Sequence, residues 1–175
     1  MNHSIYLSPD ELSRLVVEAA VNADEQGFWN GPRPIAEDAV GHLVRFLGLL
    51  LAGDDDISPK EMDVFADVFA AAAGERPPHE ELRASVLDSV LLADDPDALQ
   101  EYLVSTPDYL RAVMAMDRER GTRNADQVVT ALSGLGLAVL AADGQAAVEE
   151  DAIFITHLNH LRGELEAQGV AVTTD

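Results

Sequence analysis

The sequence contains no cysteine and few basic or aromatic residues. Without cysteine the chain has no disulfide, no thiolate nucleophile and no sulfur ligand for zinc; this composition fits a reducing compartment, and we expect a cytoplasmic protein. Lys and Arg number 11 against 32 Asp and Glu, which gives a net charge of −21. This charge repels nucleic-acid phosphates and anionic membrane surfaces, and it attracts cations and basic partners. Aromatic residues make up 5% of the chain, so the core must rely on Ala, Leu and Val, as packed helices do.

The chain also has no long hydrophobic run and no strand-like alternation of apolar and polar residues. Its longest uncharged stretch, from Val128 to Ala142, contains two glycines and is shorter than the roughly 20 residues that span a bilayer. The first residues lack the charged and apolar layout of a signal peptide. We therefore expect an all-α protein without a membrane-inserted segment, and, at 175 residues, a single globular unit.

Helix start and stop signals recur along the chain and predict about seven to eight helices. The segments Ser8-Pro9-Asp10-Glu11 and Ser58-Pro59-Lys60-Glu61 each combine an N-cap serine, a proline in the first turn and a glutamate three residues after the serine. The predicted helices cover residues 9–27, 35–52 and 59–74, a fourth that opens within 75–82 and ends at 94, then 98–104, 106–121, a stretch from 124 onward, and 148–168. Residues 1–34 look like an N-terminal helix and loop packed on a helical domain of residues 35–175. A lone tryptophan in a helical protein is usually a core plug, so we interpret Trp29 in this loop in that way, with a ligand-facing ring as the alternative.

Two segments of the sequence match each other without gaps when Leu43 is placed on Leu132. The identical pairs include Leu51 with Leu140, Ala52 with Ala141, Asp54 with Asp143, Glu61 with Glu150, and Phe65 with Phe154. Each copy consists of an apolar helix, an acidic loop and an amphipathic helix. Such a match argues for one structural unit that is used twice.

The acidic pair of each copy, Asp54 with Glu61 and Asp143 with Glu150, is open to two interpretations. In the first, the carboxylates only cap helix ends. A cap of this kind stabilises the fold by about 1 kcal/mol and requires no ligand. In the second, the Asp and Glu of each copy face one another and share a divalent cation. Hard oxygen ligands of this kind suit Ca²⁺, Mg²⁺ or Mn²⁺, and Asp56 is an additional candidate ligand.

The two copies differ in the serine that a capping box requires. Ser58 is the capping partner of Glu61 in the first copy, whereas Ala147 occupies the corresponding position of the second copy, which keeps Glu150. The second copy therefore weakens the interpretation based on capping alone. Glutamate near a helix N-terminus still benefits from the helix dipole, so that interpretation stays open.

The segments LLLAGDDDISPKE and LAVLAADGQAAVEE resemble the two acidic signatures of the TerB-like family, which is associated with bacterial tellurite resistance. Its pattern is an apolar helix that ends in Ala-x-Asp-Gly, followed by Ile-Ser-Pro and a glutamate. The residues that carry the pattern are Leu51, Ala52, Asp54, Ile57, Ser58, Pro59 and Glu61 in the first copy and Ala141, Asp143, Gly144 and Glu150 in the second. The resemblance covers residues 35–168 and implies an all-helical, pseudo-symmetric domain with an acidic cluster for divalent metal and a role in stress resistance. Asp55 stands where the pattern has glycine, and the second copy lacks Ile-Ser-Pro, so the first copy is the expected metal site.

Other chemistry has weaker support in the sequence. His157 and His160 lie three residues apart on the last predicted helix, one turn before Glu164. This spacing is compatible with a transition-metal site, but surface histidines so spaced are usually incidental. We identify no catalytic residue and expect no organic cofactor. The expected function is a non-enzymatic module that binds a divalent cation and a protein partner, a second copy of the chain included. The alternative is a metal-free scaffold in which the carboxylates only cap helices.

Overall fold

The computed structural model describes residues 7–53, 57–142 and 148–172, except for the side chains of 148–150. Within these ranges the chain forms eight helices and no strand, which confirms the prediction of an all-α protein. The helices are α1 (Pro9–Glu25), α2 (Ile35–Leu51), α3 (Pro59–Ala73), α4 (His79–Ala93), α5 (Pro96–Leu103), α6 (Asp108–Arg120), α7 (Asn124–Leu140) and α8 (Val148–Ala167). Their ends lie within a few residues of the predicted ones.

Side-chain hydrogen bonds determine where several of these helices begin. At α1, Ser8 Oγ accepts from the backbone N–H of Glu11, and the Glu11 carboxylate accepts from the backbone N–H of Ser8, so the predicted capping box is formed. Asp117, near the end of α6, is buried and accepts hydrogen bonds from the side chain of Asn124 and the backbone N–H of Ala125. One carboxylate therefore ties the end of α6 to the start of α7.

The sequence repeat corresponds to two helical hairpins with matching ends. Under the offset that places Leu43 on Leu132, α2 begins and ends where α7 does, and α3 begins where α8 does. Leu43 and Leu132 are both fully buried, and Leu51 and Leu140 are buried at the ends of the two apolar helices. The hairpins α2–α3 and α7–α8 are thus the structural counterpart of the repeat.

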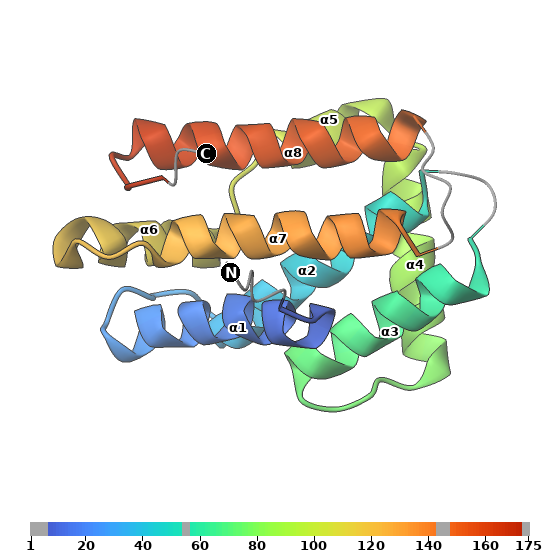
Figure 1. Cartoon of the computed structure of the whole chain (residues 1–175), viewed down its shortest axis with the longest axis horizontal. Coiled ribbons are helices and arrows are strands. Elements are labelled where there is room, and N and C mark those ends of the chain that lie inside the picture. Colours follow the sequence, from blue (N-terminus) through green and yellow to red (C-terminus); the bar gives the residue numbers. More distant parts are fainter. Residues whose placement is uncertain (1–6, 54–56, 143–147, 173–175) are drawn as a thin grey trace, which may run out of the picture.

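The helix α2 is the centre of the molecule. It packs against α1, α3, α4, α6, α7 and α8, and every residue from Phe46 to Leu51 is buried. The helix α1 lies alongside α7, as α8 does on the other side of α7 (Figure 1). Because Val16 and Ala20 of α1 are fully buried, the N-terminal helix belongs to the same hydrophobic core. In the part of the chain that the structure describes, no helix has both the length and the apolar character needed to cross a membrane.

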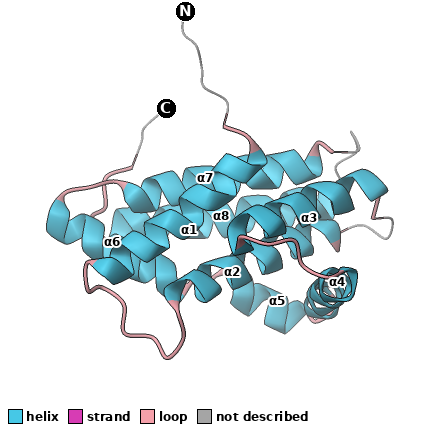
Figure 2. Ribbon diagram, turned by 90° about the horizontal axis from the view of Figure 1, so that it is seen from below, coloured by secondary structure: helices cyan, strands magenta, loops and turns pink. Residues whose placement is uncertain are grey.

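Glycines allow close approach where the helices of the bundle meet. The helix α4 runs across the others: it is upright in Figure 1 and is seen end-on in Figure 2. It contacts α2 at Gly48, where an added Cβ would collide with the side chain of Ser89. A Cβ on Gly136 of α7 would collide with the ring of Phe154 on α8, and one on Gly134 would come within 2.8 Å of a leucine of α1. These two glycines therefore let α8 and α1 approach α7 closely.

Candidate functional site

Glu61, the predicted metal ligand whose side chain the structure describes, serves the start of α3. Its Oε2 accepts a hydrogen bond of 2.7 Å from the backbone N–H of Ser58, and Ser58 Oγ accepts one of 3.2 Å from the backbone N–H of Glu61. Glu61 is also only 2% exposed. This reciprocal capping is the arrangement expected when the carboxylate serves a helix start, and as it stands it does not fit an open cation ligand.

The other predicted ligands fall outside the described part of the structure. Asp54, Asp56 and Asp143 belong to segments that are not described, and neither is the side chain of Glu150. The helices on either side of these segments are described: α2 and α7 end, and α3 and α8 begin, at the right-hand end of the molecule in Figure 1. Among the described residues, no three His, Cys, Asp or Glu side chains are grouped so that they could hold a metal ion.

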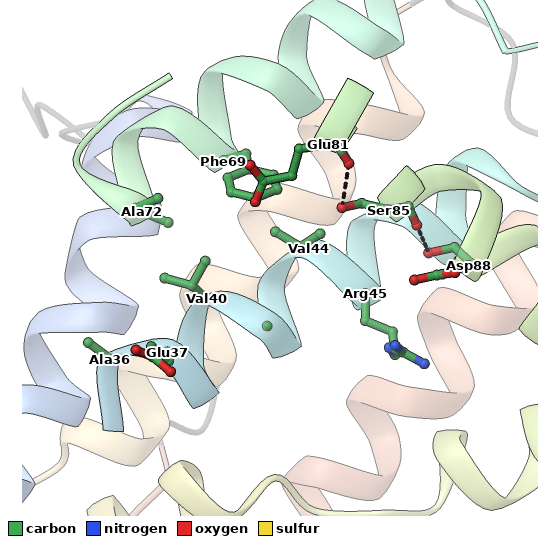
Figure 3. A pocket seen from close by; sticks show the side chains of 13 residues that line it. Ala36, Glu37, Val40, Val44, Arg45, Phe69, Ala72, Glu81, Ser85 and Asp88 are labelled. Carbon is green, nitrogen blue, oxygen red and sulfur yellow. Dashed lines mark hydrogen bonds between the residues drawn. The ribbon is translucent and has the colours of Figure 1, made fainter. Parts of the chain in front are cut away.

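An open groove of about 460 Å³ runs along α2 between α3 and α4. Val40 and Val44 of α2 form its floor, and Phe69 and Ala72 line it from α3 (Figure 3). The helix α4 forms the other wall, where Ser85 Oγ donates a hydrogen bond to a backbone carbonyl of the preceding turn of the same helix. The groove borders α2 over residues 36–45, which is about 14 Å, or two and a half turns, at the rise of an α-helix.

Charged side chains surround the apolar floor of the groove. Glu37, Glu81 and Asp88 are exposed and line the groove together with a single basic residue, Arg45. Figure 3 shows Glu37 toward one end of the groove, with Arg45 and Asp88 toward the other. The ion pairs found among the described residues involve other carboxylates. The rim therefore carries more negative than positive charge, and its carboxylates are available to a basic group from outside.

One residue that lines the groove, Gly41, has open space at the position of its missing side chain. An added Cβ at this position would meet no atom within 4 Å. A larger side chain at position 41 would therefore find open space at the edge of the groove without displacing the chain. Gly163 on α8 has the same free space and does not line the groove, which makes it a matched control position.

A second polar feature, a chain of buried hydrogen bonds, joins α6, α2 and α8 in the core. The Tyr109 hydroxyl lies 3.0 Å from His42 Nδ1, His42 Nε2 lies 3.0 Å from His157 Nε2, and His157 Nδ1 lies 3.1 Å from the carbonyl oxygen of Leu103. Tyr109 and His157 are fully buried and His42 is 8% exposed. The Tyr102 ring stacks on His157 with ring centroids 5.1 Å apart. The two repeats are thus linked by polar contacts as well as apolar ones.

The Leu103 carbonyl determines where the protons of this chain lie. Because a carbonyl oxygen only accepts, His157 Nδ1 carries a proton, and Nε2 of the neutral ring is an acceptor. His42 Nε2 therefore donates to His157, and Tyr109 donates its hydroxyl proton to His42 Nδ1. Burial lowers the pKa of His42 well below its ordinary value, with a further contribution from the neighbouring His157. Burial also lowers the pKa of His157, against the opposing effect of the hydrogen bond to Leu103.

Both imidazoles are consequently neutral near pH 7, and all four of their nitrogens are engaged. Such a network specifies how a core packs, since each member would leave an unsatisfied polar group if its partner were lost. The pair is therefore better suited to holding the two repeats together than to acid–base catalysis.

The structure turns His157 and His160 toward different partners. His157 is fully buried, so the expectation of a surface histidine is wrong, because α8 turns this residue toward α2. His160 Nε2 lies 3.0 Å from the Thr106 hydroxyl. The two rings therefore bind different partners and do not converge on a common point.

The sequence analysis missed His42, although a signal for it exists. Ile35, Ala39, Phe46 and Leu49 form a stripe at helical spacing along α2, and His42 is the polar member of that stripe. A polar residue at such a position must find a buried partner when the helix is central.

Trp29 fills the edge of the core without being fully buried. It packs against core residues from a half-exposed position, and its Nε1–H donates a 2.8 Å hydrogen bond to the carbonyl of Arg33. A Cβ on Gly31 would collide with the indole ring. The tryptophan thus also shapes its own loop between α1 and α2.

The sequence matches no protein-family model, and neither a curated protein nor a solved structure matches it. Function must therefore be inferred from the chain's own groove, charges and hairpins.

Proposed function

We propose that the chain is a non-enzymatic interaction module that docks a protein partner in the groove between α2, α3 and α4. The observation that carries this proposal is an apolar floor, Val40 and Val44, beside rim carboxylates that have no ion pair within the described structure. Burying open apolar surface favours association by about 25 cal/mol per Å² before the entropic and desolvation costs of binding are subtracted. Rim charges steer a partner of opposite sign and fix its orientation. A setting in stress resistance is part of the proposal and is supported by the two acidic segments that resemble TerB-like signatures.

Filling the groove tests this function. Gly41→Met places a long side chain over the floor, and Gly163→Met makes the same change outside the groove. Replacing a helical glycine with free space around it is expected to raise stability by roughly 0.5–1 kcal/mol in both variants, so neither should unfold. In affinity capture from the native cell, followed by quantitative mass spectrometry, we expect wild type and Gly163→Met to retain a partner that Gly41→Met loses. Equal retention by all three chains would locate docking elsewhere.

Divalent-cation binding by the acidic loops is a second proposal, supported by the position of the hairpins. The helices α2 and α7 end, and α3 and α8 begin, at the same end of the molecule (Figure 1). Calorimetric titration with Ca²⁺, Mg²⁺ and Mn²⁺ tests it: we expect binding by wild type and its loss in Asp54→Asn. No heat at millimolar concentrations of any of the three ions would favour the metal-free module, in which Glu61 only caps α3.

A further inference from the structure

We infer that the segment held by the groove is a basic amphipathic helix of two to three turns, an inference that rests on the proposed docking function. The groove borders residues 36–45 of α2, or about 14 Å of helix. A helix docked in a groove presents anchors at i, i+3 or i+4, and i+7, which span roughly 10 Å. Three such anchors therefore fit along the floor, Val40 and Val44, and beside Phe69 of α3.

Small residues around the floor allow a partner backbone to come close. Ala36 and Gly41 of α2 and Ala72 of α3 line the groove, with Ser85 facing them from α4. In Figure 3, Ala72 of α3 and Ser85 of α4 lie to the left and right of Val44 of α2. A groove with short side chains on its walls suits an occupant that supplies the large apolar groups itself. Long aliphatic side chains on one face of a helix are groups of this kind.

The charge of the rim determines the sign of the partner. Glu37, Glu81 and Asp88 are exposed, and one guanidinium, that of Arg45, accompanies them. Lys or Arg on the flanks of a docked helix would reach these carboxylates, whereas acidic flanks would be repelled. The same argument disfavours a second copy as the occupant, because a chain with 32 acidic and 11 basic residues brings further negative charge to a negative rim.

Designed probe peptides test the inference on the full chain. The first is a fluorescent 14-residue helix with Leu at i, i+4 and i+7 in its central turns and Lys or Arg on both flanks of that apolar face. The second carries Glu in place of the basic residues, and the third has the composition of the first in an order that abolishes the apolar face. In fluorescence anisotropy at low salt, we expect the basic amphipathic probe to bind at least about tenfold more tightly than either control. Its affinity should fall as salt is raised, because the rim charges become screened.

Variants of the chain separate groove binding from general attraction to an acidic protein. Gly41→Met should weaken the basic probe at least about tenfold, and Gly163→Met should leave it unchanged. Glu81→Lys should weaken it several-fold, while Glu166→Lys, an equal change of charge at an exposed position of α8 outside the groove, should have little effect.

Four results would overturn the inference. Equal binding of the amphipathic and reordered basic probes, or equal binding to both glycine variants, would mean that charge alone attracts the peptide. Self-association lost in Gly41→Met, measured by analytical ultracentrifugation, would assign the groove to a second copy. If no probe binds but Gly41→Met still loses a native partner, the docking function stands and the partner chemistry is wrong.

Discussion

Acidification from pH 7 to pH 5 is expected to destabilise the fold through His42 and His157. Burial lowers the pKa of both rings below the ordinary value of about 6.5. As the pH falls through this range, the rings of the unfolded chain therefore take up protons before the buried rings of the folded chain do. The unfolded state thus binds more protons below about pH 6.5, so the free energy of unfolding falls as the pH falls. The stability associated with the neutral rings is complete above that pH and is lost below it.

The magnitude follows from the number of rings and the width of the pH range. Each ring that stays neutral when folded contributes at most about 1.4 kcal/mol per pH unit below pH 6.5. From pH 7 to pH 5 this sets an upper limit of roughly 2 kcal/mol for one ring and roughly 4 kcal/mol for the pair. Native domains have about 5–15 kcal/mol in total, so a loss near this limit is a large fraction of the total. Relief of repulsion among the many carboxylates acts in the opposite direction, so variants have to be compared at each pH.

Urea unfolding between pH 5 and pH 7.5 measures this effect. The chains to compare are wild type, His157→Gln, which removes one buried titrating ring, and His79→Gln, which removes an exposed histidine at the start of α4. Below pH 6.5, His157→Gln should flatten the dependence of stability on pH by up to about 1.4 kcal/mol per unit, and His79→Gln should parallel wild type. If the curves of wild type and His157→Gln are parallel as well, the buried ring gains no extra proton on unfolding and the reasoning is wrong.

Three further substitutions are expected to change the free energy of urea unfolding at pH 7: two should lower it and one should raise it. Ser58→Ala removes the oxygen that accepts from the Glu61 backbone N–H and should cost about 1 kcal/mol; an unchanged midpoint would mean that the box does not hold α3. Gly136→Ala introduces a Cβ that collides with Phe154 and should cost about 1–3 kcal/mol, unless the ring moves away freely. Gly41→Ala fills open space on a helix and should gain roughly 0.5–1 kcal/mol; a loss would show that the position is not open.

Helix boundaries were predictable because their signals are local. At α1 and α3 a serine, a proline and a glutamate lie within four residues of one another, so the hydrogen bonds that start each helix depend on no distant part of the chain. The hairpin repeat was predictable for a similar reason, since one offset aligns both of its helices.

The polar chain and the groove were not predictable, because each depends on contacts between distant segments. His42 and His157 are 115 residues apart, and spacing along the chain contains no information on that distance. The groove exists because α4 crosses α2 at Gly48, and the crossing angle of two helices is set by packing in three dimensions. For Glu61, local pattern and structure agree on the cap, while cation binding at the acidic loops stays a prediction.

The two hairpins differ at residues that form the groove, and these differences place the proposed docking function on the first hairpin, α2–α3. The offset that superposes them places His42 on Ala131 and Gly48 on Leu137. The glycine lets α4 lie against α2 and so provides one wall of the groove, whereas Leu137 is 55% exposed at the corresponding point of α7. A leucine there would hold a crossing helix farther away, so the second hairpin is not built to receive such a wall. The first hairpin therefore forms the groove. The second hairpin packs against it in the core and provides His157, which binds His42 on the central helix α2.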